Sequence, residues 1–221
     1  MERISEVFNI DCMVGMAQYP DKYFDLAVVD PPYGIGEDGV GKSRHKGGNV
    51  FTEFKKKNWD NVRPTAQYFK ELKRVSKHQI IWGANYYPEH LSPSMGWIFW
   101  DKNIGGDFSD GELAYTSFQR ALRMVSITVE RNCATNAVSA MKYKRIHPCQ
   151  KPIKLYSWIY KNYLPEGGKV IDTHLGSGSN RIAATKAGNI DFTGYELDND
   201  YFDAMEKRYK DFKSQTVMEF V

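Results

Sequence analysis

The chain has 221 residues, of which 42% are hydrophobic and 26% are charged, and these values are ordinary for a globular protein. The length suits one α/β domain and is short for two, so we expect a single domain over residues 1–221. The formal net charge is +3, but it is unevenly placed. Residues 165–221 hold seven Lys and Arg against ten Asp and Glu, which leaves 23 against 17 for residues 1–164. The N-terminal part would therefore attract a polyanion.

Several classes of protein are excluded by what the sequence lacks. It shows no signal peptide and no apolar window long enough to cross a bilayer. The three cysteines, Cys12, Cys133 and Cys149, are widely spaced and form no C-x-x-C pair. A disulfide framework and a zinc cluster are therefore not expected. We expect a cytoplasmic protein with no membrane partner and no metal.

Predicted strands alternate with predicted helices along the chain. The apolar run from Phe24 to Val29 ends at an acid and two prolines, which indicates a buried parallel strand stopped by a loop. Residues 34–58, rich in Gly, Lys and Asn, predict a mobile loop. Beyond it the patterns predict strands over 79–82, 96–100, 121–129, 169–172 and 191–196, and helices over 64–77, 153–163, 180–187 and 200–212. This alternation predicts an α/β fold with a mostly parallel sheet.

The segment from Lys169 to Glu196 has the outline of a nucleotide-binding unit. A strand leads into Gly176-Ser177-Gly178, here called the glycine turn, and then into a helix and a strand that ends in Glu196. Glycines let the backbone approach a ligand, and a helix N-terminus offers unpaired N–H groups. Glu196 follows Gly176 by about 20 residues, the separation expected of an acid that binds ribose hydroxyls. Arg181 occupies the place of the third glycine of G-x-G-x-x-G, which favours a smaller adenosine ligand over a dinucleotide.

The most specific motif is Asp30-Pro31-Pro32-Tyr33, here called the DPPY turn. It follows a predicted parallel strand, and ligands bind beyond the carboxyl ends of such strands. The exocyclic amino group of adenine or cytosine is a poor nucleophile because its lone pair is delocalised into the ring. The Asp30 carboxylate and the Pro31 carbonyl could each accept one of its N–H groups, held in place because proline fixes φ. Tyr33 could stack on an extruded base. The motif predicts methyl transfer from a sulfonium, promoted by positioning and by a carboxylate.

Both halves together resemble the β-class amino-methyltransferases of DNA, in which the DPPY strand precedes the glycine turn. Further similar blocks cover most of the chain: Asn9–Cys12, Glu71–Val75, Ile80–Trp82, His147-Pro148-Cys149-Gln150-Lys151-Pro152, Leu175–Ser179 and Gly194–Asp198. The resemblance implies a Rossmann-like methyltransferase fold with helices on both faces of a mostly parallel sheet and a circularly permuted motif order. It also implies S-adenosylmethionine as the cofactor.

Roles for individual residues follow from this resemblance. Asp11 would contact the adenine of the cofactor and Glu196 its ribose. The methionine portion would lie beside Gly176, Ser177, Gly178, Lys151, Pro152 and Asp172, and the target base would be held by Asp30, Pro31, Pro32 and Tyr33. Two departures fall near the expected cofactor: Asp172-Thr173-His174-Leu175 replaces the usual Asp-Pro-Phe, and Asn180 stands where Thr is more usual. His174 could sense pH if it lies close to the carboxylates.

The DPPY form resembles adenine N6 enzymes more often than cytosine N4 enzymes, which tend to begin with Ser. We therefore expect site-specific transfer to the N6 amino group of adenine in double-stranded DNA, with the target base flipped, and keep cytosine N4 as the alternative. A homodimer is a possible assembly. The predicted phosphate contacts are Lys42, Arg44, Lys46, Lys142, Lys144 and Arg145.

Two alternative functions from other classes of protein stay open. A nicotinamide-dependent oxidoreductase would rest on the unit from Gly176 to Glu196, but Arg181 and the DPPY turn argue against it. A catalytically silent nucleic-acid-binding protein would keep the fold without the chemistry. The intact Asp30, Tyr33 and Glu196 argue against that reading.

Overall fold

The structure, a computed structural model, describes residues 3–39, 54–104, 109–129 and 145–218. Its strands in those ranges form one sheet in the order β1-β8-β7-β2-β3-β5-β4-β6. Neighbouring strands are parallel except where β5 pairs antiparallel with β3 and with β4. The bounds are β1 (Ser5–Phe8), β2 (Phe24–Val29), β3 (Ser76–Trp82), β4 (Trp97–Asp101), β5 (Gly111–Thr116), β6 (Arg123–Ser126), β7 (Gly168–Asp172) and β8 (Ile190–Tyr195). The predicted α/β fold with a mostly parallel sheet is confirmed.

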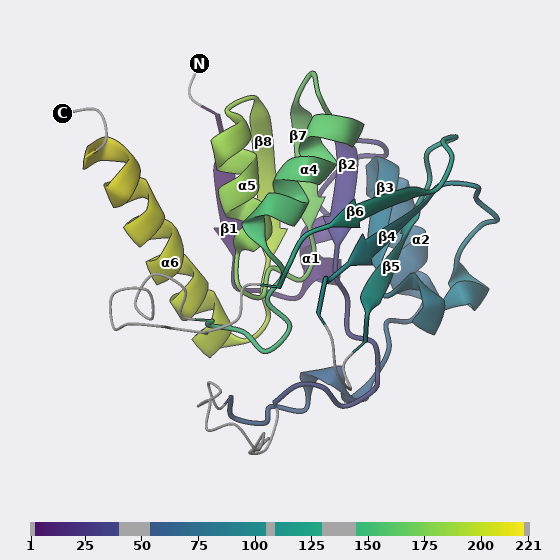
Figure 1. The fold of residues 1–221 in the computed structure, drawn as a ribbon, viewed down its shortest axis with the longest axis horizontal. Coiled ribbons are helices and arrows are strands. Elements are labelled where there is room, and N and C mark those ends of the chain that lie inside the picture. The colour runs from purple at the N-terminus through teal and green to yellow at the C-terminus, as the bar shows by residue number, and fades with distance from the viewer. Residues whose placement is uncertain (1–2, 40–53, 105–108, 130–144, 219–221) are drawn as a thin grey trace.

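Helices cover both faces of this sheet (Figure 1). They are α1 (Cys12–Met16), α2 (Ala66–Val75), α4 (Ile153–Tyr163), α5 (Ser179–Ala187) and α6 (Asn199–Met218). Helices α4 and α5 lie in front of the sheet in Figure 1, and α1 and α2 lie behind it. Short 3-10 turns occupy residues 59–61, 84–86 and 88–90. No helix in the described ranges is long and apolar enough to span a membrane.

Strand β2 supplies side chains to a separate hydrophobic core on each face. Leu26 and Val28 belong to the core built with α4 and α5, while Ala27 and Val29 belong to the core built with α2. Successive side chains of a strand point to opposite faces, so a strand buried on both faces is apolar throughout. The apolar residues Leu26–Val29, which helped to predict this strand, are the consequence.

The pairing of β2 with β7 brings together segments that are far apart in the chain. Leu26 lies beside Val170 and Ala27 beside Ile171. The carboxyl end of β2, which leads into the DPPY turn, therefore lies next to the carboxyl end of β7, which leads to the glycine turn. Both motifs share one edge of the sheet.

Strands β1 and β5 and helix α1 were not among the predicted elements, and β6 is shorter than predicted. Strand β1 is a four-residue edge strand of alternating burial, too short for a clear period. In β5 only Leu113, Ala114 and Tyr115 form an apolar run. Of the predicted mobile loop, residues 34–39 and 54–58 hold neither helix nor strand, and residues 40–53 lie outside the described ranges.

Replacement of Ile80 by Ala tests the centre of this sheet. Ile80 lies on β3 and is fully buried, so its truncation leaves a cavity and should lower the free energy of unfolding by about 2–5 kcal/mol. Urea denaturation followed by circular dichroism measures the change. Met124→Ala on β6, where the side chain is 63% exposed, is the control and should change stability by less than about 0.5 kcal/mol. Equal midpoints for the two variants would contradict the assigned core.

Candidate active site

Acidic side chains gather at the edge of the sheet where the parallel strands end. Asp30 follows β2, Asp172 ends β7 and Glu196 follows β8. Glu112 reaches this edge from the opposite direction, because β5 is antiparallel to β3 and begins where β3 ends. The carboxyl edge of a parallel sheet is the usual place for a ligand.

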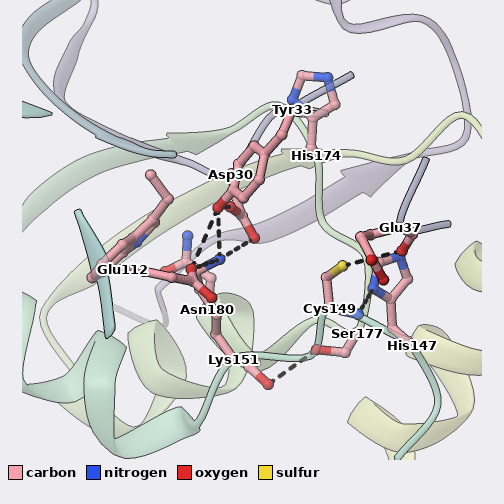
Figure 2. A network of polar contacts seen from close by, with 12 residues as sticks. Asp30, Tyr33, Glu37, Glu112, His147, Cys149, Lys151, His174, Ser177 and Asn180 are labelled. Carbon is pink, nitrogen blue, oxygen red and sulfur yellow. Dashed lines mark hydrogen bonds and ion pairs between the residues drawn. The ribbon is translucent and has the colours of Figure 1, made fainter. Parts of the chain in front are cut away.

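Both carboxylate oxygens of Asp30 have a donor (Figure 2). The Tyr33 hydroxyl donates to Oδ1 at 2.7 Å and the Lys151 ammonium donates to Oδ2 at 2.5 Å. Burial raises the pKa of Asp30 above its usual range, and the charge of Lys151 opposes that rise. The acid that the sequence singled out is thus half-buried, paired and held in one orientation.

Lys151 lies between two carboxylates. Its side chain is 4% exposed. Its Nζ lies 2.5 Å from Oδ2 of Asp30 and 2.9 Å from Oε2 of Glu112. The ammonium of Lys102 lies 2.8 Å from the other oxygen, Oε1, of Glu112. Burial alone would raise the pKa of Glu112, but the two ammonium groups bring it down to about 2. Lys151 was predicted to lie beside the cofactor, and the structure brings its ammonium to the DPPY turn.

The Tyr33 ring packs against neighbouring residues of the site. It stacks on Tyr86, with ring centroids 4.9 Å apart and planes at 15°. Gly83 follows β3 with φ of +63°, and a Cβ there would overlap the Tyr33 ring. Neither Tyr86 nor Gly83 was identified from the sequence, although Gly83 directly follows the recognised strand residues Ile80–Trp82.

Asp60 fixes the backbone that leaves the DPPY turn. Its carboxylate is 2% exposed. Oδ1 accepts from the backbone N–H of Tyr33 at 2.6 Å and of Gly34 at 2.9 Å, and Oδ2 accepts from that of Glu37 at 2.9 Å. Three charge-assisted hydrogen bonds from one buried side chain hold this loop. Asp60 was not identified from the sequence, because it lies in a short 3-10 turn, residues 59–61, that has no apolar periodicity.

Glu196 binds the glycine turn directly. Its Oε2 accepts from the backbone N–H of Gly176 at 2.8 Å, and its Oε1 accepts from that of Asp198 at 2.9 Å. Ser177 is buried, with its hydroxyl 3.1 Å from that of Ser179. Gly178 has φ of +68°, and a Cβ there would overlap Met205. The predicted cofactor residues of this half therefore lie together.

Asn180 explains one departure from the family pattern. Its amide donates to Oδ2 of Asp172 at 2.8 Å and to the Val28 carbonyl at 3.1 Å, and its own oxygen accepts from the Tyr160 hydroxyl. The backbone N–H of His174 donates to the other oxygen of Asp172 at 3.1 Å. Burial still raises the pKa of Asp172 to about 7. This carboxyl is therefore close to half protonated at neutral pH.

The two remaining cofactor candidates lie at helix starts. Asp11 is exposed and caps α1, with Oδ1 accepting from the Met13 N–H at 2.7 Å. The hydrogen bond from the Glu196 N–H to the Phe8 carbonyl, at 3.1 Å, ties the ends of β8 and β1 together, so Asp11 belongs to the same edge of the sheet. Pro152 is buried and precedes α4.

Both histidines near the site are neutral at physiological pH. His147 packs against Trp59 and Tyr201, and its Nδ1 accepts from the Cys149 N–H at 3.2 Å. Burial lowers the pKa of His147 to about 3 and that of His174 to about 4. His174 therefore does not change charge near neutral pH, contrary to the pH-sensing role that the sequence left open.

Most of the predicted phosphate contacts cannot be placed in the site. Lys42, Arg44, Lys46, Lys142 and Lys144 lie outside the described residues. Arg145 is described and half-buried, and its guanidinium donates to the Pro148 carbonyl. Within the described ranges, no three His, Cys, Asp or Glu side chains are grouped to hold a metal ion.

Comparison with known proteins decides the family. The family model N6_N4_Mtase, described as DNA methylase, matches residues 81–207, which is more than half of the chain. The chain belongs to this DNA methylase family. The resemblance to DNA amino-methyltransferases is thereby confirmed, and the matched stretch includes Glu112, Lys151, the glycine turn and Glu196.

Individual relatives agree with the family match. YubD of Escherichia coli (strain K12), named as a methylase, is 25% identical over 221 residues, covering 93% of this chain and 90% of the relative. The M1.HpyAVI–SAM complex has a TM-score of 0.58 at 16% identity, covering 92% of this chain and 98% of that one. The cytosine-N4-specific PvuII DNA methyltransferase has a TM-score of 0.60 at 12% identity, covering 94% and 87%. These structures confirm the Rossmann-like methyltransferase fold.

Asp60→Ala should loosen the DPPY turn of this methylase. The variant leaves three part-buried backbone N–H groups without their acceptor, and a hydrogen bond to a charged group contributes about 1.5–3 kcal/mol. We expect the Tyr33, Gly34 and Glu37 amides to exchange with deuterium at least about tenfold faster. Hydrogen exchange followed by NMR measures this. Asp21→Ala, which removes a 76% exposed carboxylate, is the control, and equal exchange in both variants would refute the role of Asp60.

Proposed function

We propose that the chain transfers a methyl group from S-adenosylmethionine to the N6 amino group of adenine at a specific site in DNA. The observation that carries the proposal is the half-buried Asp30 carboxylate, paired with Lys151, which the β2–β7 pairing sets beside Asp172 and the glycine turn. Membership of the DNA methylase family supports an amino group of a DNA base as the acceptor. The preference for adenine rests on the DPPY form.

The residues at the glycine turn fit such a cofactor. A Cβ at Gly178 would overlap Met205, so the turn keeps its tight shape only with glycine. Asp172 is a buried carboxyl whose pKa of about 7 suits a site that receives positive charge. Glu196 and Asp11 lie at the ends of adjacent strands, in reach of an adenosine. When bound, S-adenosylmethionine supplies a methyl group on a positively charged sulfur, and M1.HpyAVI has been solved with this cofactor.

The DPPY turn would hold the amine for in-line attack. Asp30 accepts one N–H and the Pro31 carbonyl accepts the other, with Pro31 and Pro32 fixing the backbone. The N–C bond forms as the S–C bond breaks, the sulfur keeps the electron pair, and the extra amine proton passes to Asp30. Tyr33, stacked on Tyr86, forms an aromatic wall against which the flipped base would rest. The flipped base, the homodimer and the phosphate contacts stay predictions from the resemblance.

Cytosine N4 is the second candidate. The two acceptors at the DPPY turn would serve either base, and the fold is shared with the cytosine-N4-specific PvuII enzyme. The oxidoreductase reading is not retained, because Arg181 is buried and binds Glu206 and Ser5 within the fold. The family match favours an enzyme over a silent binding protein.

Asp30→Asn tests the proposed chemistry. It keeps the shape of the side chain but replaces a charged acceptor, so methyl transfer should fall at least about 100-fold. Tritiated S-adenosylmethionine and unmodified genomic DNA provide the assay, and chromatography of the digested nucleosides identifies the product. N6-methyladenine is expected, and N4-methylcytosine would select the second candidate. Asp191→Asn is the control, because Asp191 lies on β8 and pairs with Arg3. Wild-type protein that methylates neither base would refute the proposal.

Asp172 predicts a proton release on cofactor binding. At pH 7 its carboxyl is about half protonated, because its pKa is about 7. A cationic ligand lowers that pKa, so binding should release up to about half a proton at pH 7 and none at pH 9, where the carboxyl is already ionised. Calorimetry of S-adenosylmethionine binding in buffers of different ionisation enthalpy measures the release. Asp172→Asn should abolish it, and the same release from that variant would exclude Asp172 as its source.

A further inference from the structure

Each oxygen of Asp30 already accepts a hydrogen bond from a group of its own protein. The Tyr33 hydroxyl lies on Oδ1 at 2.7 Å and the Lys151 ammonium lies on Oδ2 at 2.5 Å. A target amine that donates to Asp30 along the direction now used by Tyr33 or Lys151 displaces that group. Lys151 is 4% exposed, and a buried ammonium that loses its anion is strongly unfavourable unless another anion receives it.

One oxygen in the site faces both of these groups. Oε2 of Glu112 lies 2.9 Å from Nζ of Lys151 and 3.4 Å from the Tyr33 hydroxyl. The other oxygen of Glu112 is held by Lys102 at 2.8 Å, so the carboxylate has a fixed orientation. Figure 2 shows Asp30 and Tyr33, both from the DPPY turn, converging with Glu112 and Lys151 from two other segments of the chain.

We propose that Glu112 is a positioning residue, which receives Lys151 or the Tyr33 hydroxyl when the target amine takes its place on Asp30. The role rests on the proposed function and deepens it, because it explains how a carboxylate can be held in place before the base arrives and still be released to it. Glu112 acts through Lys151 and Tyr33 and need not touch the base.

The charges around Asp30 set the direction of the expected effects. Burial raises the pKa of Asp30, Lys151 lowers it, and Glu112 raises it. Without the charge of Glu112, the ammonium has only Asp30 as its anion, so it binds Asp30 more tightly and the pKa of Asp30 falls. Without Lys151, the two carboxylates repel each other and the pKa of Asp30 rises. The other titratable groups that respond to the charge of Asp30 all have raised pKa values: Tyr33, Tyr68, Tyr87, Cys149, Tyr156 and Asp172.

Glu112→Gln is the direct test, because glutamine keeps the shape and one acceptor oxygen but removes the charge. At saturating DNA and S-adenosylmethionine, the rate constant of methyl transfer should fall at least about tenfold, the effect of one charge-assisted hydrogen bond. The Kd for S-adenosylmethionine should stay within about twofold. The acid limb of the rate should move to lower pH in Glu112→Gln and to higher pH in Lys151→Met.

Two further variants separate this role from a loss of folding. Glu112→Asp keeps the charge but withdraws it by one methylene, and should restore part of the rate and of the pH profile. Glu71→Gln removes a carboxylate of comparable exposure from an ion pair with Arg74 outside the site, and should leave the rate and the profile unchanged. A wild-type rate and pH profile in Glu112→Gln would overturn the proposed role.

The titration of Asp30 provides a test that needs no turnover. The carboxyl carbons of labelled aspartates can be followed by NMR, with the Asp30 signal assigned by its loss in Asp30→Asn. Its pKa should be lower in Glu112→Gln than in the wild type and higher in Lys151→Met. An unchanged pKa in Glu112→Gln overturns the inference even where wild-type protein is inactive on DNA, whereas an inactive wild type with the expected shifts overturns the proposed function alone.

Discussion

The parallel pairing of β2 with β7 is the constraint on which the site depends. It sets Leu26 beside Val170 and Ala27 beside Ile171, and so places the residues that follow each strand at one point of the sheet edge. Asn180 connects the two strands at that point, since its amide donates both to the Val28 carbonyl and to Asp172. The DPPY turn and the glycine turn, which are far apart in the chain, thereby become one site.

A second connection between these halves runs through the segment from Lys57 to Asp60. Lys57 pairs with Asp198 at 2.5 Å and with Asp200 at 2.6 Å beyond β8. Three residues later, Asp60 holds the backbone of Tyr33 and Gly34. The DPPY turn is thus fixed at its start by β2 and at its end by a segment that is itself anchored on the cofactor half. Such a turn can hold acceptors in place before the base binds, which is where positioning lowers a barrier most.

The elements predicted with correct bounds have a strong apolar pattern and a simple packing environment. Helix α4 has the predicted bounds, Ile153–Tyr163, because its apolar spacing faces one core. Strand β2 also has its predicted bounds, Phe24–Val29, because burial on both faces leaves Leu26–Val29 apolar. Asp30 was found because ligands lie beyond the carboxyl ends of parallel strands, and Glu196 because of its separation from the glycine turn. Asp172 was implied by the family resemblance.

The rule that ligands lie beyond the carboxyl ends of parallel strands does not identify every residue of the site. Glu112 stands at the amino end of β5, and only the antiparallel direction of that strand brings it to the site. Asp60 binds backbone N–H groups, which every residue but proline carries, so no residue pattern marks its partners. For Lys151 the resemblance to a known block indicates that the residue lies near the site, but not that its ammonium turns toward Asp30. Side-chain direction depends on packing that no local pattern encodes.

The carboxylates of Asp30 and Glu112 lie in different environments, which favours different roles for them. Asp30 and Glu112 share Lys151, yet burial raises the pKa of Asp30 while two ammonium groups lower that of Glu112 to about 2. Paired groups whose pKa values are pushed apart divide acid–base work between them. A methylated amine must lose a proton, and of the two carboxylates only Asp30 has a raised affinity for one. In the proposed role Glu112 keeps the charge that Lys151 needs when Asp30 is engaged, so the proposed proton acceptor and the fixed anion are separate residues.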